Sequence, residues 1–190
     1  MEPTEVLAAW FGDGWGEIVG TGRTQQRGDI DPLPAFWEIG MVGVAVDVDP
    51  QTGHVEVQQL VTLGDVGRAI LPEGVEGQDL GAAMQGLGGA LYEELIYDGP
   101  QIVNANLVEY RVPRIVDLPP RRTSLIMERG DGIGPYGAKG VGEGAMTAVG
   151  AAITTAVATA VGCWPERVPL TPERVCELID QQARTAQQPV

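Results

Sequence analysis

A glutamate set among glycines is the first feature of this sequence that could do chemistry. The segment Gly137–Gly144 reads GAKGVGEG, and its one carboxylate, Glu143, directly precedes a long uncharged run. A carboxylate at a helix N-terminus is stabilised by the helix dipole, and glycines let a ligand approach the backbone. With an apolar helix behind it, Glu143 could act as a general base. Two other interpretations stay open: a capping acid, or a phosphate cradle that Lys139 would favour and Glu143 would oppose.

A glutamine in a second glycine-rich segment is the other candidate. Gln85 lies in the run Met84–Gly88, which reads MQGLG. A side-chain amide offers two hydrogen-bond donors and one acceptor to a ligand. An exposed glutamine on a helix is the alternative interpretation, and the pattern alone does not separate the two.

Composition excludes several other kinds of chemistry. His54 is the one histidine, which excludes a Ser-His-Asp triad, a Cys-His pair and a multi-histidine metal site within this sequence. Two cysteines are too few for an iron–sulfur cluster, which takes four thiolates. The net charge of −14 repels phosphate backbones and anionic lipid surfaces, so neither nucleic acid nor a membrane surface is an expected partner.

The elements that must position these residues can be read from local patterns. Alternating valines predict strands over 40–48 and 55–61, joined by a turn at Asp49–Gly53. Residues 1–36 are expected to be irregular and 63–77 to form a loop. Leucine and methionine spacing predicts a helix over 78–95, although its glycines imply a closely packed neighbour or ligand.

The second half of the sequence predicts one further strand and two helices. A short strand is expected at 107–110, followed by an extended, proline-rich connector over 111–122. The run Gly144–Cys163 has the length of a membrane span, but its alanines and threonines favour a buried helix that must be covered on all sides. Thr171 and Pro172 open a final helix, and residues 184–190 are expected to fray. The acidic start, without the features of a signal peptide, favours a cytoplasmic protein.

Taken together, these segments resemble a known family. Their order and separations are similar to the C-terminal part of the molybdenum-binding large subunit of the xanthine dehydrogenase/aldehyde oxidase family, and Gly142-Glu143-Gly144 resembles its bacterial branch. The residues that carry this resemblance are Val46–Gly53, Gly77-Gln78, Met84–Gly88, Glu93–Leu95, Tyr136–Glu143 and Thr171–Val175.

The resemblance implies both a fold and a site. It implies an α+β half-domain over 1–190, in which a β-hairpin and short strands pack with a glycine-rich helix and a long buried apolar helix. Glu143 matches the family's active-site glutamate, and Gln85 matches a glutamine that contacts the molybdenum cofactor. The neighbouring residues that the resemblance places beside the cofactor are Gly86, Lys139, Gly140, Val141 and Gly142. None of these is expected to bind the metal directly.

The implied activity is oxidative hydroxylation of an electron-poor carbon in an N-heterocycle or aldehyde, with water as the oxygen source and Glu143 as general base. Because the family's large subunit is several times longer, the sequence is expected to be either a split subunit or a fragment. The molybdopterin cofactor, in its cytosine dinucleotide form, would be shared with a second molybdenum-binding chain. Iron–sulfur clusters and FAD would lie on other subunits. The alternatives are a structural or assembly subunit without catalysis, and a phosphate-binding module built on Gly137–Gly144.

Overall fold

The computed structural model describes residues 2–12, 19 and 38–186. The chain divides into two units, Met1–Pro34 and Ala35–Val190. In the first unit, helix α1 (Pro3–Phe11) begins with proline at its first position and with reciprocal hydrogen bonds between Glu2 and Glu5. The expectation of an irregular segment is therefore wrong for residues 3–11. For 13–18 and 20–36 it lies outside the described residues.

A three-stranded sheet forms the base of the second unit, in the order β1-β2-β5. Strand β1 (Gly40–Val48) pairs antiparallel with β2 (Val55–Asp65), which confirms the predicted hairpin and extends its second strand by four residues. Strand β5 (Arg121–Met127) pairs parallel with β2. The prediction of an extended connector is wrong at this point, because the connector over 111–122 contains a short 3₁₀ turn, η1 (Ile115–Asp117), and runs into β5.

The hairpin turn is fixed by one glycine. Gly53 has φ = 69°, in the left-handed region that favours glycine, and a side chain at this position would collide with the backbone of Pro172. The turn is therefore held against the start of the last helix, α4 (Pro172–Ala186).

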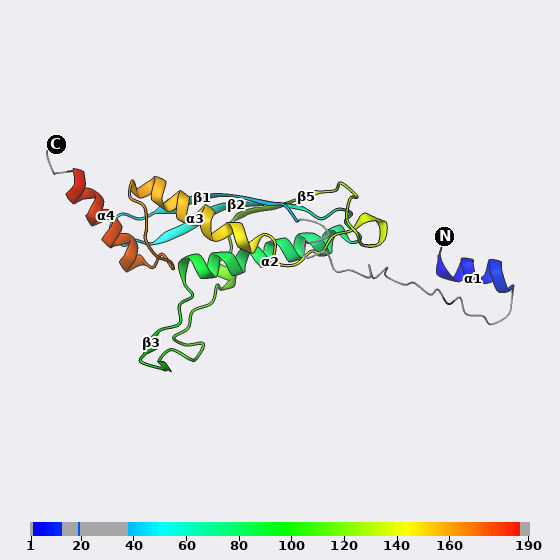
Figure 1. Cartoon of the computed structure of the whole chain (residues 1–190), viewed down its shortest axis with the longest axis horizontal. Helices are drawn as coiled ribbons and strands as arrows, with labels where there is room; N and C mark the ends of the chain where they lie inside the picture. Colours follow the sequence, from blue (N-terminus) through cyan, green and yellow to red (C-terminus); the bar gives the residue numbers. More distant parts are fainter. Residues whose placement is uncertain (1, 13–18, 20–37, 187–190) are drawn as a thin grey trace, which may run out of the picture. The chain divides into compact units, whose positions relative to one another are not determined.

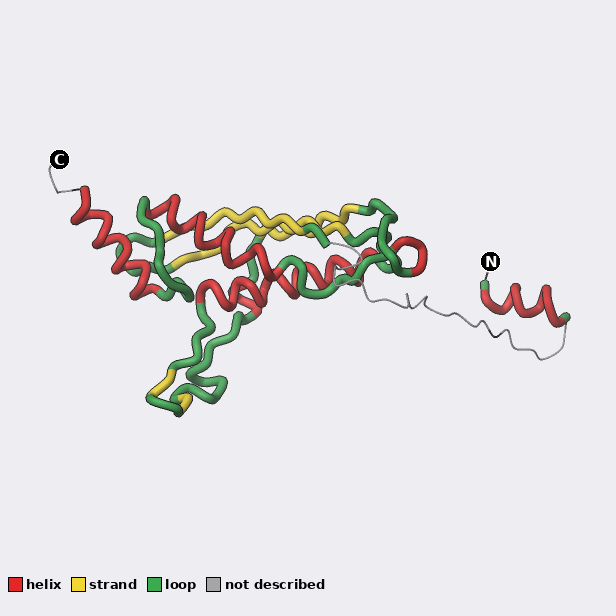
Figure 2. Tube along the Cα trace, viewed as in Figure 1, coloured by secondary structure: helices red, strands yellow, loops and turns green. Residues whose placement is uncertain are grey.

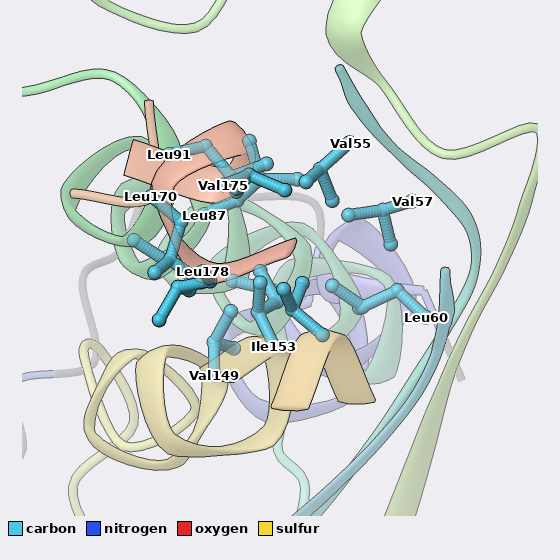
Figure 3. Close-up of a cluster of buried hydrophobic side chains, with 13 residues drawn as sticks. Val55, Val57, Leu60, Leu87, Leu91, Val149, Ile153, Leu170, Val175 and Leu178 are labelled. Carbon is cyan, nitrogen blue, oxygen red and sulfur yellow. The ribbon is translucent and has the colours of Figure 1, made fainter. Parts of the chain in front are cut away.

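Two helices cover one face of the sheet (Figure 1). Helix α2 (Pro72–Leu91) packs on β2 and β5, and α3 (Met146–Val161) packs on β1 and on α2. Figure 3 shows the apolar side chains of β2, α2, α3 and α4 pointing toward one another in the resulting core. The predicted helix over 78–95 was placed too late, because α2 begins at Pro72, within the predicted loop, and ends at Leu91.

Helix α3 is found where the uncharged run predicted it, but its burial is one-sided. Val149, Ile153 and Val157 are fully buried at spacings of four residues. Thr155 and Thr159 lie on the exposed face, where each hydroxyl donates to the carbonyl four residues earlier. This chain therefore covers one side of the helix, and the prediction that the helix is covered on all sides, with a partner chain supplying the rest, stays a prediction. Within the described part of the chain, no helix combines the length and apolar character that a bilayer span requires.

An arm leaves the end of α2 before the chain returns to β5 (Figure 2). It carries a small hairpin of β3 (Tyr97–Asp98) and β4 (Gln101–Ile102). The strand predicted at 107–110 is wrong, because this stretch is a turn in which the Asn106 side chain accepts hydrogen bonds from two following backbone N–H groups. Helix α4 continues to Ala186, so the expected fraying does not begin at 184, and 187–190 lie outside the described residues.

Charged side chains gather at the end of the core where β2 stops. Asp65 and Asp79 are both 2% exposed, and Ser124 of β5 donates to Asp79 at 2.9 Å. Glu38, just before β1, is partly buried beside them, and a side chain at Gly144 would collide with its carboxylate. Burial first, and then the charges of Asp79 and Asp65, raise the pKa of Glu38.

We predict that Gly86→Ala destabilises the chain, although alanine is the better helix former. An added Cβ would lie 2.7 Å from Val149 Cβ and 2.9 Å from the Met146 carbonyl oxygen, so α2 and α3 would have to separate. Overpacking costs about 1–3 kcal/mol, which exceeds the gain of about 1 kcal/mol from replacing glycine within a helix. Gly89 is the matched control, because nothing lies within 4 Å of a Cβ there, and Gly89→Ala should stabilise. Urea denaturation of both variants checks this, and two stabilised variants would contradict it.

We also predict that Glu38→Gln stabilises the chain more at pH 7 than at pH 4. Because the pKa of Glu38 is raised on folding, the stability that its protonated form supplies is present below the unfolded pKa and is lost as pH rises through the folded pKa. Glutamine cannot ionise, so the variant escapes this loss. Melting temperatures relative to wild type measure the effect, with the exposed Glu76→Gln as control. An equal difference for Glu38→Gln at both pH values would refute the prediction.

Candidate active site

The structure brings the two candidate functional side chains together. Gln85 lies on α2 and Glu143 lies 58 residues later, just before α3, yet Gln85 Nε2 donates a hydrogen bond to Glu143 Oε1 at 3.3 Å. Both side chains are exposed in this chain. The hydrogen bond uses one of the two amide N–H donors, so the amide keeps a further donor and its carbonyl oxygen for other contacts.

The close packing of α2 against α3 brings Gln85 and Glu143 into contact. Gly86, directly after Gln85, is buried against Met146 and Val149 in the first turn of α3. The Met146 N–H donates to the Glu143 carbonyl at 3.1 Å, which joins Glu143 to the start of the helix. A carboxylate at this position benefits from the positive end of the α3 dipole.

The loop before Glu143 is folded on itself and attached to the end of β2. The N–H groups of Gly132 and Gly134 donate to the carbonyls of Gly137 and Ala138, at 2.9 and 3.0 Å. The Lys139 N–H donates to the Val66 carbonyl at 2.9 Å. The loop therefore leaves β5, is held against the end of β2 and reaches α3 by a defined path.

Lys139 has a set of partners that sequence reasoning missed. Its side chain is 5% exposed, and its Nζ lies 2.8 Å from Asp65 Oδ2 and 3.0 Å from Asp131 Oδ1. The hydrogen bond from Lys139 lowers the pKa of Asp65, and the same bond raises the pKa of Lys139. These contacts occupy the ammonium with carboxylates, which weighs against both the phosphate cradle and Lys139 as a cofactor-binding residue. No sequence signal pointed to Asp65, which lies 74 residues away.

The three residues between Lys139 and Glu143 leave open backbone beside the glutamate. A Cβ added at Gly140 or Gly142 would meet nothing within 4 Å, and Val141 is half-buried. Within the described part of the chain, the N–H groups of residues 140–142 donate to no backbone carbonyl.

A small apolar cavity of about 180 Å³ lies on another side of α2, between that helix and β5. Leu80, Met84 and Leu118 are among its lining residues. It is smaller than typical ligand pockets. In the described residues, no group of three or more histidine, cysteine, aspartate or glutamate side chains is placed to hold a metal ion.

Comparison with known proteins identifies the family. The model of the molybdopterin cofactor-binding domain matches residues 10–119. The chain is 37% identical over 140 residues to the gamma subunit of the 6-hydroxypseudooxynicotine dehydrogenase complex of Paenarthrobacter nicotinovorans, covering 72% of this chain and 18% of that protein. It is 36% identical over 146 residues to the xanthine dehydrogenase molybdenum-binding subunit of Escherichia coli O157:H7, covering 76% of this chain and 19% of that protein.

The solved structures agree with these relatives. Quinoline 2-oxidoreductase from Pseudomonas putida 86 superposes with a TM-score of 0.67 at 35% identity, covering 72% of this chain and 18% of that chain. The sequence thus spans about a fifth of the length of the relatives it matches. The α+β class implied by the resemblance is confirmed, with the sheet and helices arranged as in these molybdenum-binding domains. The chain belongs to the molybdopterin cofactor-binding domain family, within the molybdenum-binding subunits of the xanthine dehydrogenase and aldehyde oxidase group.

Proposed function

We propose that this chain supplies one wall of the active site of a molybdenum hydroxylase, with Glu143 as the general base and Gln85 as a cofactor contact. The observation that carries the proposal is the contact of the two side chains at 3.3 Å, both exposed, on a surface bordered by open glycine backbone. An amide and a carboxylate in contact are suited to hold one polar group and to take a proton from another.

The residues present fit the molybdenum cofactor. The remaining amide donor of Gln85 and the N–H groups of residues 140–142, which donate to no backbone carbonyl in the described residues, offer several donors to a polar, oxygen-rich group. Open space over Gly140 and Gly142 allows that group to approach the backbone. Gly86 has a different role, because it is buried in the contact between α2 and α3. When bound, the cofactor would supply the two-electron oxidation of an electron-poor carbon, with water as the source of oxygen.

The two site residues, Glu143 and Gln85, have defined tasks in the proposed reaction. Glu143 accepts a proton at Oε2 or Oε1, and the Gln85 amide holds the carboxylate in a fixed orientation. An N-heterocycle or an aldehyde, the substrate classes in the names of several relatives, would be bound mainly by other parts of the complex.

The cofactor's anionic groups need another chain. This chain carries a net charge of −14, and its buried Lys139 contacts two carboxylates. A cytosine dinucleotide tail carries phosphates, which such a surface repels. We therefore assign the tail to a second molybdenum-binding chain, and the iron–sulfur clusters and FAD to further cytoplasmic subunits.

The other face of the sheet, which no helix of the described residues covers, supports docking of that second chain. On the face away from α2 and α3, Met41, Leu63 and Leu125 lie side by side across the three strands by register. Met41 is 65% exposed and Leu125 is 46% exposed. Adjacent apolar side chains on an uncovered sheet face are typical of an interface in an obligate complex.

We predict that Glu143→Gln retains the molybdenum cofactor but stops turnover. The amide is nearly isosteric and cannot accept the proton, so the rate should fall by about 10²–10⁴-fold. Turnover of quinoline, xanthine and an aromatic aldehyde with a dye as electron acceptor measures this, alongside molybdenum content of the complex. A fully loaded Glu143→Gln complex with wild-type rates would instead favour the non-catalytic structural subunit.

Gln85→Ala should lower the cofactor content or the turnover rate less than Glu143→Gln lowers turnover, because one hydrogen bond contributes about 0.5–1.5 kcal/mol.

We also predict that Met41→Asp prevents stable assembly. The variant places a charge at the β1 end of the apolar row, where docking would bury it without a partner. The experiment coexpresses the chain with a second chain carrying the segments of the relatives that this sequence does not match, followed by gel filtration. Trp164→Asp is the matched control, because Trp164 is 64% exposed but lies in the loop after α3 and not on a strand of the sheet. Equal loss of the complex in both variants would remove the sheet face as the docking surface.

A further inference from the structure

The buried ion pair between Lys139 and Asp65 lies at the start of the short segment that leads to Glu143. Asp65 ends β2 with its side chain 3% exposed, and its two carboxylate oxygens hold different groups. Oδ1 accepts from the Gly67 N–H at 3.1 Å, and Oδ2 accepts from the Lys139 ammonium at 2.8 Å. One carboxylate therefore fixes both the turn after β2 and the loop that approaches α3.

The loop is attached to this turn at two further points. The Lys139 N–H donates to the Val66 carbonyl at 2.9 Å, and the Gly130 N–H donates to the Gly67 carbonyl at 2.8 Å. Only residues 140–142 separate Lys139 from Glu143, and two of them are glycines with open space around them. Because glycine restrains the backbone least, the position of Glu143 depends on the anchors at the two ends of this short segment.

One anchor is the start of α3, and the other is Lys139. A buried ion pair contributes little net stability, since desolvation of both charges offsets their attraction. Its directional contacts are more informative, because Lys139 must extend toward Asp65 and Asp131 for both to be satisfied. This fixes the direction in which the chain leaves residue 139.

We propose that Lys139 is a positioning residue, whose buried ion pair with Asp65 fixes the start of the segment 139–143 and thereby sets the Glu143 carboxylate against Gln85. The inference rests on the proposed function for its effect on turnover, but not for its effect on the loop. In this proposal Lys139 acts on Glu143 through the backbone of the segment 139–143 and does not contact the cofactor directly.

The test compares four variants of the complex that contains this full chain. Lys139→Met leaves Asp65 as an unpaired buried charge, whereas Lys139→Met with Asp65→Asn removes both charges of the pair. Lys139→Arg keeps the charge. Arg174→Met is the control, because Arg174 is 15% exposed on its side chain and pairs with Glu94 at 2.7 Å at the other end of α2.

Hydrogen exchange of peptides covering residues 138–147 provides a readout that needs no turnover. We expect Lys139→Met to speed exchange of the backbone amides at positions 139 and 146 by at least about tenfold, as local opening becomes easier. The double variant should recover the melting temperature but keep the fast exchange. Arg174→Met should lower the melting temperature and leave exchange in this segment unchanged.

Turnover provides the second readout. A misplaced catalytic group costs about 10²-fold, so the double variant should lose kcat with little change in KM, and Lys139→Arg should restore most of it. If the double variant recovers stability, slow exchange and kcat together, the ion pair is only structural and the proposal is overturned. If instead Glu143→Gln turns over normally while Lys139→Met still loosens the segment, the proposed general base fails and the anchoring of the loop stands.

Discussion

The contact between α2 and α3 at Gly86 is the constraint on which the site depends. Without a side chain at Gly86, Val149 and the Met146 carbonyl can lie directly against α2. This approach brings Gln85, the preceding residue on α2, within hydrogen-bond distance of Glu143, which precedes α3. The same contact buries Val149 and Ile153 in the core, so site geometry and core packing rest on one pair of helices.

The features that sequence could predict are those set by local patterns. Alternating valines and a proline–glycine turn gave the hairpin, because its strands are neighbours in sequence. Strand β5 was missed because Arg121–Met127 pairs parallel with β2, about 60 residues away, and its polar half has no apolar alternation. The predicted start of helix α2 is too late because Pro72 and Gly74 are typical loop residues, although proline also suits the first helical position.

The site could be predicted only in part, because sequence patterns report local structure and not contacts between distant segments. Glu143 and Gln85 are recognisable from their glycine-rich surroundings and from the family resemblance, and the structure places them in contact. The partners of Lys139 are not recognisable, since Asp65 lies at the end of a distant strand and Asp131, in the same loop, has no distinctive spacing. A lysine in a glycine loop looks like an anion-binding residue until the carboxylates that surround it are known.

The distribution of charge explains how such a site can be divided between chains. An exposed carboxylate beside open backbone is well solvated here, and it meets a dry, strongly electrostatic environment only when another surface covers it. Because the nearest lysine is engaged with Asp65 and Asp131, this side can supply a proton acceptor and neutral donors but little positive charge. Under the proposed function, the covering chain must bring the cations that balance the cofactor's phosphates. Complementary charge would then favour pairing of the two walls over self-association of this acidic chain, because two copies of a surface with a net charge of −14 repel each other.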